Sequence, residues 1–371
     1  MQKVSLSSLL TTLGYGLAME QRVFPMDRVK HNDIIRHASA IADKAAFVAD
    51  DFAQALFPRT DVVFNDRMLS SARQYLRRVV GEIEKRICTI ATEDLGVTQE
   101  MFATIGKGRD GPSFTLLEDT GLLRTSEIVR HLLVKTQQGE LAARLLQKIS
   151  QEDLESTLTC HLDHEDPVVA KAAMALLVAQ SKTSGVSGEI AASLADMPAE
   201  ILYAFAWPVT AALTRLTDFA GPQLQQATER LLASHDESTG VARKAERLAQ
   251  LLEQSSAEKG RVPHPMKDGL SLFIARLARK SGLTGDQIVT FTTEPDMARL
   301  VVVMRAANFP AQEALSIFAA LDGGGQILTT ATYEETDLDR AKALVSRWAT
   351  PDIYQKAQRT LSRNMLSDHG E

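Results

Sequence analysis

Hydrophobic residues recur at intervals of three and four positions through several long stretches of the chain. Between residues 65 and 91 they form one stripe, with charged and polar residues on the other face, which predicts an amphipathic helix. The stripe consists of Met68, Leu69, Ala72, Tyr75, Leu76, Val79, Val80, Ile83 and Ile87. The same spacing recurs in two further sets: Ile128, Leu132, Leu141, Leu145 and Ile149, and Leu338, Ala341, Val345 and Trp348. Alternation with a period of two is rare, and its best example is the short stretch 329–333, so the sequence predicts an all-α protein.

Prolines and capping residues mark where helices are expected to begin. Asp166, Gly221 and Thr350 each directly precede a proline, which at the first position of a helix loses no hydrogen bond. Thr284 and Gln287 have the spacing of a capping box ahead of an apolar run. Helix starts are therefore expected at all four places.

Breaks rich in glycine or proline divide the chain at 106–112, 255–265 and 323–325. They predict three segments: an N-terminal helical segment over 1–110, a repeat segment over 111–255 and a C-terminal helical segment over 266–371. The helices of the middle segment look short and paired, which is typical of stacked helical hairpins.

Several motifs carry a resemblance to known helical proteins. Residues 164–174, His-Glu-Asp-Pro-Val-Val-Ala-Lys-Ala-Ala-Met, resemble the second helix of a HEAT-type repeat, in which Asp-Pro precedes a buried Val and small residues. The other motifs are Asp-Arg-Met-Leu at 66–69, Tyr-Leu-Arg-Arg-Val-Val at 75–80, Leu-Leu-Glu at 116–118, Gly-Leu-Leu at 121–123, Phe-Ile-Ala-Arg-Leu-Ala at 273–278 and Arg-Ala-Ala-Asn-Phe-Pro at 305–310. On these motifs the chain resembles the alphaproteobacterial domain of unknown function 2336 family. The resemblance implies a HEAT-like α-solenoid with additional N- and C-terminal helical segments, and it brings no catalytic motif or cofactor.

The composition narrows the classes of partner. Against 41 Lys and Arg the chain has 47 Asp and Glu, a formal net charge of −6, so no general attraction to nucleic acid is expected. Aromatic residues make up only 5%, too few for the stacking platforms that bind single-stranded nucleic acid. Two cysteines exclude a disulfide scaffold.

Neither a secretion signal nor a membrane span is expected. The first twenty residues have the outline of a signal peptide, but Ser and Thr interrupt the apolar stretch and no small-residue cleavage site follows. The longest aliphatic run, at 300–304, is far shorter than the ~20 residues that a spanning helix needs. We therefore expect a cytoplasmic protein with no membrane partner.

A dense acidic stretch between residues 151 and 166 is the candidate partner-binding surface. It contains no Lys or Arg and six carboxylates: Glu152, Asp153, Glu155, Asp163, Glu165 and Asp166. Such a face attracts a basic segment of another protein. The alternative is that these acids only favour helix N-termini and solubility.

The same stretch contains residue types that bind zinc. Cys160, His161 and His164 could supply ligands if the loop curled around an ion. However, no second Cys or His pair lies at metal-finger spacing, and polar residues are ordinary in the turn of a helical hairpin. We therefore favour a solvated turn and expect no metal or cofactor.

A glycine-rich basic loop offers an alternative ligand site. Lys107 and Arg109 lie among glycines whose amides could approach a phosphate, and Arg73 and Arg77 lie one turn apart on the predicted helix over 65–91. The loop is not a Walker motif, because no Ser or Thr follows its Gly-Lys. A solvated basic loop and an exposed helix face remain the other interpretation.

Motifs of the common catalytic types are absent from the sequence, so we do not expect an enzyme. The leading interpretation is a non-catalytic helical-repeat scaffold or adaptor that binds another protein along a helical face. Alternatives are a regulatory protein that binds a nucleotide or other anionic small ligand, and a metal-dependent enzyme at His161 and His164. Self-association also fits the pattern, since a second copy can cover the exposed ends of an extended helical protein. The cations of the predicted helix over 65–91 could complement the acidic stretch across such a dimer.

Overall fold

Helix is the regular secondary structure of this protein. The computed structural model describes residues 34–39, 41, 66–98, 102, 112–148, 159–183, 192–217, 221–258, 260–294, 296–321, 328–351, 353–354 and 357. These residues form α-helices and short 3₁₀ turns and no β-strand, which confirms the all-α prediction.

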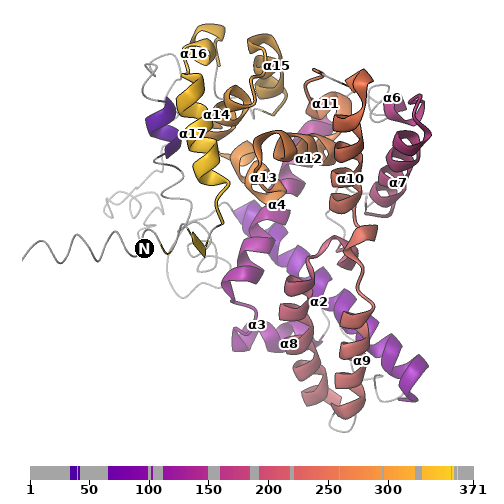
Figure 1. Cartoon of the computed structure of the whole chain (residues 1–371). Helices are drawn as coiled ribbons and strands as arrows, with labels where there is room; N and C mark the ends of the chain where they lie inside the picture. Colours follow the sequence, from indigo (N-terminus) through magenta and orange to yellow (C-terminus); the bar gives the residue numbers. More distant parts are fainter. Residues whose placement is uncertain are drawn as a thin grey trace, which may run out of the picture.

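The helices form two groups, which Figure 1 shows one above the other. The lower group contains α2 (Asp66–Leu95), α3 (Pro112–Thr120), α8 (Ala199–Thr217) and α9 (Gly221–Ala233). The upper group contains α6 (Thr159–Leu162), α7 (Pro167–Thr183), α10 (Val241–Gln254), α11 (Pro265–Asp268), α12 (Leu270–Ser281), α13 (Gly285–Thr293), α14 (Ala298–Ala306), α15 (Ala311–Leu321), α16 (Thr330–Glu334) and α17 (Leu338–Trp348). Three 3₁₀ turns, η4 (Leu194–Asp196), η5 (Glu237–Thr239) and η6 (Ser256–Glu258), lie at the connections.

Helix α2 confirms the longest predicted amphipathic stripe. Seven of its nine stripe residues, from Ala72 to Ile87, are buried against α4, α8 and α9, while Met68 and Leu69 pack at the edge of the same core. The helix continues one turn beyond the predicted end, to Leu95. Glu84 is also buried on this face, which the apolar pattern did not predict.

Helix α4 (Ser126–Lys148) joins the two groups. Ile128 and Leu132, near its start, belong to the lower core, whereas Leu141 and Leu145, near its end, belong to the upper core. The lower core also combines α2 with α8 and α9, which lie more than a hundred residues later in the chain. In a solenoid each hairpin packs mainly on its neighbours in sequence. The structure therefore supports the all-α class without confirming a solenoid. Hydrophobic clusters also run across the predicted segment boundaries.

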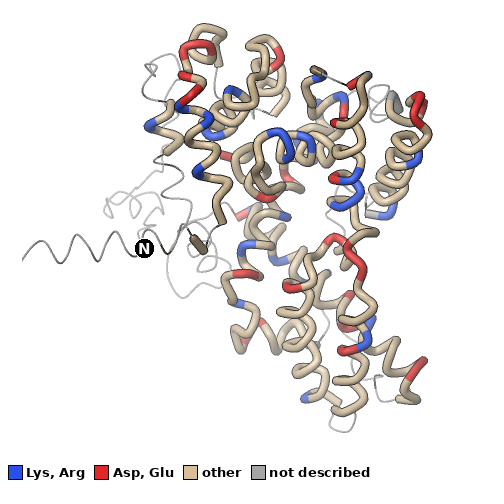
Figure 2. The backbone as a smooth tube through the Cα atoms, in the orientation of Figure 1, with Lys and Arg blue, Asp and Glu red and all other residues tan. Residues whose placement is uncertain are grey.

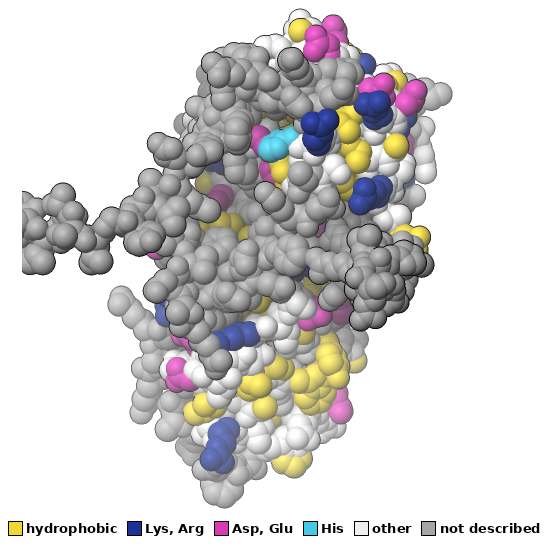
Figure 3. All heavy atoms as spheres, turned by 90° about the vertical axis from the view of Figure 1, so that its left-hand side faces the viewer, with side chains coloured by type: hydrophobic (Ala, Val, Ile, Leu, Met, Phe, Trp, Pro, Cys, Tyr) yellow, Lys and Arg dark blue, Asp and Glu magenta, His cyan; other side chains and the backbone are white. Residues whose placement is uncertain are grey.

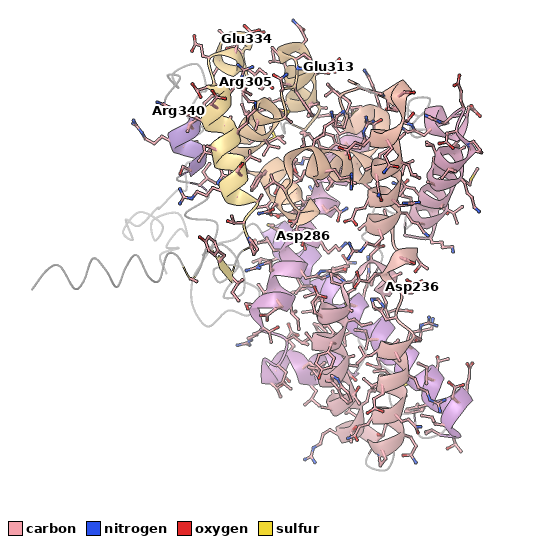
Figure 4. All side chains as sticks on the ribbon, in the orientation of Figure 1. Asp236, Asp286, Arg305, Glu313, Glu334 and Arg340 are labelled. Carbon is pink, nitrogen blue, oxygen red and sulfur yellow. The ribbon has the colours of Figure 1, made fainter. Side chains whose placement is uncertain are left out.

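The short stretch of alternating residues at 329–333 is helical. Thr329 caps α16 by accepting a hydrogen bond from the Thr332 backbone amide, and the Tyr333 hydroxyl donates to the Phe309 carbonyl over 2.9 Å. Arg305 of α14 lies close by (Figure 4) and donates to the carbonyl of Glu334. A five-residue helix is too short for its periodicity to be distinguished from that of a strand.

The aliphatic run at 300–304 is the centre of α14, and all five of its residues have an exposed fraction of 0%. Because α17 and other upper helices surround it, α14 needs no polar face. Among the helices that the structure describes, none combines the length and the hydrophobicity that crossing a bilayer requires.

Three of the four predicted helix starts are confirmed, and the one at Thr350 stays a prediction. Helix α7 begins at Pro167, directly after Asp166, and α9 begins at Gly221, so that Pro222 is its second residue. Thr284 and Gln287 form a complete capping box, in which the Thr284 side chain accepts from the Gln287 amide and the Gln287 side chain accepts from the Thr284 amide.

We expect Thr284→Ala to lower the free energy of unfolding by about 1 kcal/mol, because the Gln287 amide at the start of α13 loses its side-chain acceptor. Urea denaturation followed by circular dichroism measures the change. Thr284→Ser keeps the hydroxyl and serves as the matched control, with a loss of less than half as much. Equal midpoints for Thr284→Ala and the unsubstituted protein would contradict the prediction.

Candidate interaction surface on helices α6 and α7

The acidic residues of the described part of the predicted surface lie together. Asp163, Glu165 and Asp166 are exposed in the turn between α6 and α7. Glu152, Asp153 and Glu155 lie outside the described residues. The structure therefore places half of the predicted set on one exposed turn.

Hydrogen bonds within this turn fix its conformation. One carboxylate oxygen of Asp166, Oδ1, accepts from the Val168 amide over 2.8 Å, and the Asp166 carbonyl accepts from the Ala170 amide, so Asp166 caps α7. The Asp166 amide donates to Nδ1 of His164 over 3.0 Å. The other ring nitrogen, Nε2, lies 3.4 Å from the Ser255 hydroxyl. Asp163 and Glu165 extend outward from a turn whose backbone is already held.

His161 points in the opposite direction, into the protein. It has an exposed fraction of 0%, and its Nε2 lies 3.4 Å from Oδ1 of Asp268 at the end of α11. His161 and His164 therefore have different neighbours and do not converge, and the side chain of Cys160 lies outside the described part of the chain. Within that part, no three His, Cys, Asp or Glu side chains are grouped so as to hold a metal ion.

Asp268 is the centre of a buried network of charges. Arg261 Nη2 lies 3.2 Å from its Oδ1, Arg276 Nη1 lies 3.5 Å from its Oδ2, and the His264 amide donates to Oδ2 over 2.9 Å. Both arginines also pair with Glu258. Burial alone would raise the pKa of Asp268, but the hydrogen bond with His161 and the charges of Arg276 and Arg261 outweigh it and lower the pKa.

This network lies where the sequence predicted a linker. The described residues between η6 and α11 have no regular secondary structure, as expected, yet Glu258 and Arg261 hold that segment against α12 through Arg276. Since Asp268 also contacts His161 of α6, the network attaches the α6–α7 turn to α11 and α12. The acidic turn therefore has a fixed position on the protein.

Helix α7 is apolar on two faces. On the inner face, Val169, Ala173 and Leu176 are buried against α10 and α12. On the outer face lie exposed large hydrophobic side chains, with exposed fractions of 52% for Val168, 49% for Met174, 38% for Leu177 and 46% for Val178. A surface helix normally has polar residues on that side. Single exposed hydrophobic residues are ordinary, but four on one short helix indicate a binding face.

Charged residues lie at the two ends of this outer face. The acidic turn lies at the N-terminal end of α7, whereas Lys171 and Lys182 are exposed farther along the helix. Figure 2 shows acidic residues beside α6 and basic residues toward the other end of α7. We call this set the α7 surface: Asp163, Glu165, Asp166, Val168, Lys171, Met174, Leu177, Val178 and Lys182.

The apolar half of the α7 surface was not singled out from the sequence. A usable pattern was present, because adjacent apolar residues at 168–169 and 176–178 cannot all belong to one stripe of a helix. One face must then be left exposed or be covered by another protein.

The alternative anion site is only partly within the described residues. Arg73 and Arg77 lie on α2, and the Arg77 guanidinium lies 5.1 Å from the centre of the Phe114 ring. Lys107 and Arg109 lie outside the described ranges, so the four-residue site stays a prediction. A hollow of about 300 Å³ does lie at the C-terminal end of α7, lined by Glu82, Arg86, Lys182, Ala192, Ser193, Leu194 and Ala195.

Hydrophobic side chains are also exposed on the lower group of helices. Figure 3 shows such residues gathered there, on the side of the molecule turned away from α7. Tyr203 of α8 is exposed, and its ring meets that of Trp207 edge to face at 6.3 Å. Trp207 is only half-buried, whereas Trp348 is buried and packs edge to face on Phe291.

Comparison of the chain with protein-family models, with curated proteins and with solved structures finds no match.

Proposed function

We propose that this protein is a non-catalytic helical adaptor that binds another protein chain through the α7 surface. The observation that carries the proposal is the outer face of α7, where Val168, Met174, Leu177 and Val178 are exposed beside an acidic turn. Burial of apolar area favours association, and exposed charges at its edge select the partner and its orientation.

The chemistry of the surface defines the partner. Four hydrophobic side chains in about three turns of helix fit a partner helix that presents its own apolar row. Asp163 and Glu165 are exposed and fit Lys or Arg at one end of that row. The buried network around Asp268 supports the proposal, because a surface held in place loses little conformational freedom on binding.

The predicted HEAT-like arrangement of the helices is part of the same proposal. Helix α10 packs against both α7 and α12, and a shared hydrophobic cluster joins the three. This local row supports a HEAT-like stack that ends at α7, and the resemblance to the alphaproteobacterial domain of unknown function 2336 family supports the same architecture. In a stack, the outer helix of the last repeat is where a further protein can add.

Affinity capture with defined variants tests the proposal. We expect tagged protein to retain a specific partner chain, and Met174→Glu/Val178→Glu to retain at least tenfold less, because two buried charges would oppose the contact. Quantitative mass spectrometry of the captured proteins measures the difference.

The matched control places the same two charges elsewhere. Gln225→Glu/Gln226→Glu adds them to the exposed face of α9 and should leave capture unchanged. Circular dichroism confirms that both variants are folded. If the folded α7 variant and the α9 variant capture the same proteins in equal amounts, the α7 surface is not the binding site.

A further inference from the structure

We infer that the chain bound at the α7 surface is a second copy of this protein, with the two α7 helices packed antiparallel around a two-fold axis near Met174. This inference depends on the proposed function and names the partner for the same surface.

The distribution of charge along α7 is the first argument. The acidic residues Asp163, Glu165 and Asp166 lie at one end, and Lys182 lies at the other. In a parallel pair of α7 helices, like charges would meet at both ends. In an antiparallel pair related by a two-fold axis, each acidic turn faces the basic end of the other copy, so opposite charges meet at both ends of the pair.

The register follows from the same residues. With Met174 on the axis, position 182 of one copy lies at the level of position 166 of the other, and Lys171 lies at the level of Leu177. The exposed residues Lys171, Met174 and Val178 are three and four positions apart and therefore lie on one side of the helix. The long stem of Lys171 can pack along Leu177 while its ammonium group stays in water.

The hollow at the C-terminal end of α7 is the second argument. Lys182 and Arg86 line it together with Glu82, and both cations are exposed, so this end combines α7 with α2 and has one more cation than carboxylate. Its volume of about 300 Å³ leaves room for a carboxylate side chain. In the antiparallel register, the acidic turn of the second copy lies next to this hollow.

The position of α7 leaves its outer face accessible. Figure 1 shows α7 at the right-hand edge of the molecule, with α10 beside it on the inner side. The helix packs on α6 and α10 through the opposite face. A second copy can therefore approach without displacing any of the helices that the structure describes.

The size of the contact sets its strength. A helix of 17 residues is about 25 Å long, so a helix pair buries less than the roughly 800 Å² per partner of a standard interface. We therefore expect a dimer that forms with a dissociation constant on the order of micromolar and weakens as salt screens the end charges.

Analytical ultracentrifugation of the full chain at increasing concentration tests the pairing. We expect the unsubstituted protein to pass from monomer to dimer, Met174→Glu/Val178→Glu to weaken dimerisation at least tenfold, and Gln225→Glu/Gln226→Glu to leave it unchanged. A folded protein that stays monomeric up to several hundred micromolar overturns the inference, as does a dimer that the α7 variant still forms. Neither result decides whether a different protein binds the α7 surface, which the capture experiment measures separately.

Charge exchange tests the antiparallel register. Lys182→Glu should weaken the dimer, because its charge would then face the acidic turn, and adding Glu165→Lys should restore at least half of the lost affinity. Met174→Cys should form a disulfide between copies under mild oxidation, whereas Gln225→Cys on α9 should not. Loss of affinity without any restoration in the double variant, together with no Met174→Cys cross-link, overturns the antiparallel arrangement.

Discussion

Asp268→Ala is expected to lower the free energy of unfolding by about 3 kcal/mol, because it removes one of the two carboxylates that Arg261 and Arg276 share in a buried network. Asp268 has an exposed fraction of 1%, and Arg276, which it contacts, is also buried. Glu258 still faces Arg276, but one carboxylate then has to serve both Arg276 and Arg261. The His264 amide also loses its acceptor. Chemical denaturation of the purified protein measures the change.

An exposed ion pair is the matched control for this effect. Arg279 and Glu253 approach within 2.7 Å between α12 and α10, yet both are partly exposed to solvent. Glu253→Ala should therefore cost less than about 1 kcal/mol. Asp268→Asn, which keeps the shape and can still accept from the His264 amide, should fall between the two. An Asp268→Ala variant as stable as Glu253→Ala would show that the network contributes little to folding.

The lowered pKa of Asp268 adds a dependence on pH. In the folded protein this carboxyl stays ionised to lower pH than in the unfolded chain, so its stabilisation is present above about pH 4 and is lost as the pH falls through the folded value. The His161 contact is part of this effect, so acid should also loosen the attachment of α6.

Elements with a clear local pattern could be predicted from the sequence. The stripe from Met68 to Ile87 predicts α2, and the capping pair Thr284 and Gln287 predicts the start of α13, because both depend only on residues a few positions apart. The Asp166-Pro167 step predicts the start of α7 for the same reason.

Features that depend on distant residues could not be predicted. The sequence contains nothing that pairs α2 with α9 or divides α4 between two cores, because those contacts join residues far apart in the chain. Helix α8 continues through Pro208, although the residue before a proline usually leaves the helix. Here the packing of α8 on α2, α3 and α9 outweighs the local preference.

The candidate site was predicted only in part for the same reason. Acidity singled out Asp163, Glu165 and Asp166, which the structure places on one exposed turn. The position of His161 depends on Asp268, which lies more than a hundred residues away. The sequence alone therefore could not decide whether His161 is a zinc ligand or a buried residue in contact with Asp268. Which apolar face of α7 is covered depends on α10 and α12 in the same way.

Acidification from pH 7.5 to pH 5 is expected to lower the free energy of unfolding by about 2 kcal/mol through His131 alone. His131 is buried on α4, where its Nε2 lies 3.4 Å from the Tyr75 hydroxyl. Burial, assisted by the positive charge of Lys135, lowers the pKa of His131 to about 3, whereas the unfolded chain has the ordinary value of about 6.5. Below pH 6.5 the unfolded state therefore binds a proton that the folded state does not. Stability is complete above pH 6.5 and is lost as the pH falls toward 3.

Comparison with His131→Phe isolates this contribution from other titrating groups, since His264 is also buried with a lowered pKa and acts in the same direction. Phenylalanine fills a similar volume between α4 and α2 and cannot be protonated. We expect the unfolding free energy of His131→Phe, measured in urea at each pH, to change by about 2 kcal/mol less than that of the unsubstituted protein between pH 7.5 and pH 5. Parallel curves of unfolding free energy against pH for the two proteins would mean that His131 gains a proton in the folded state as readily as in the unfolded chain. The burial of His131 against Tyr75 would then not control the acid sensitivity of the lower core.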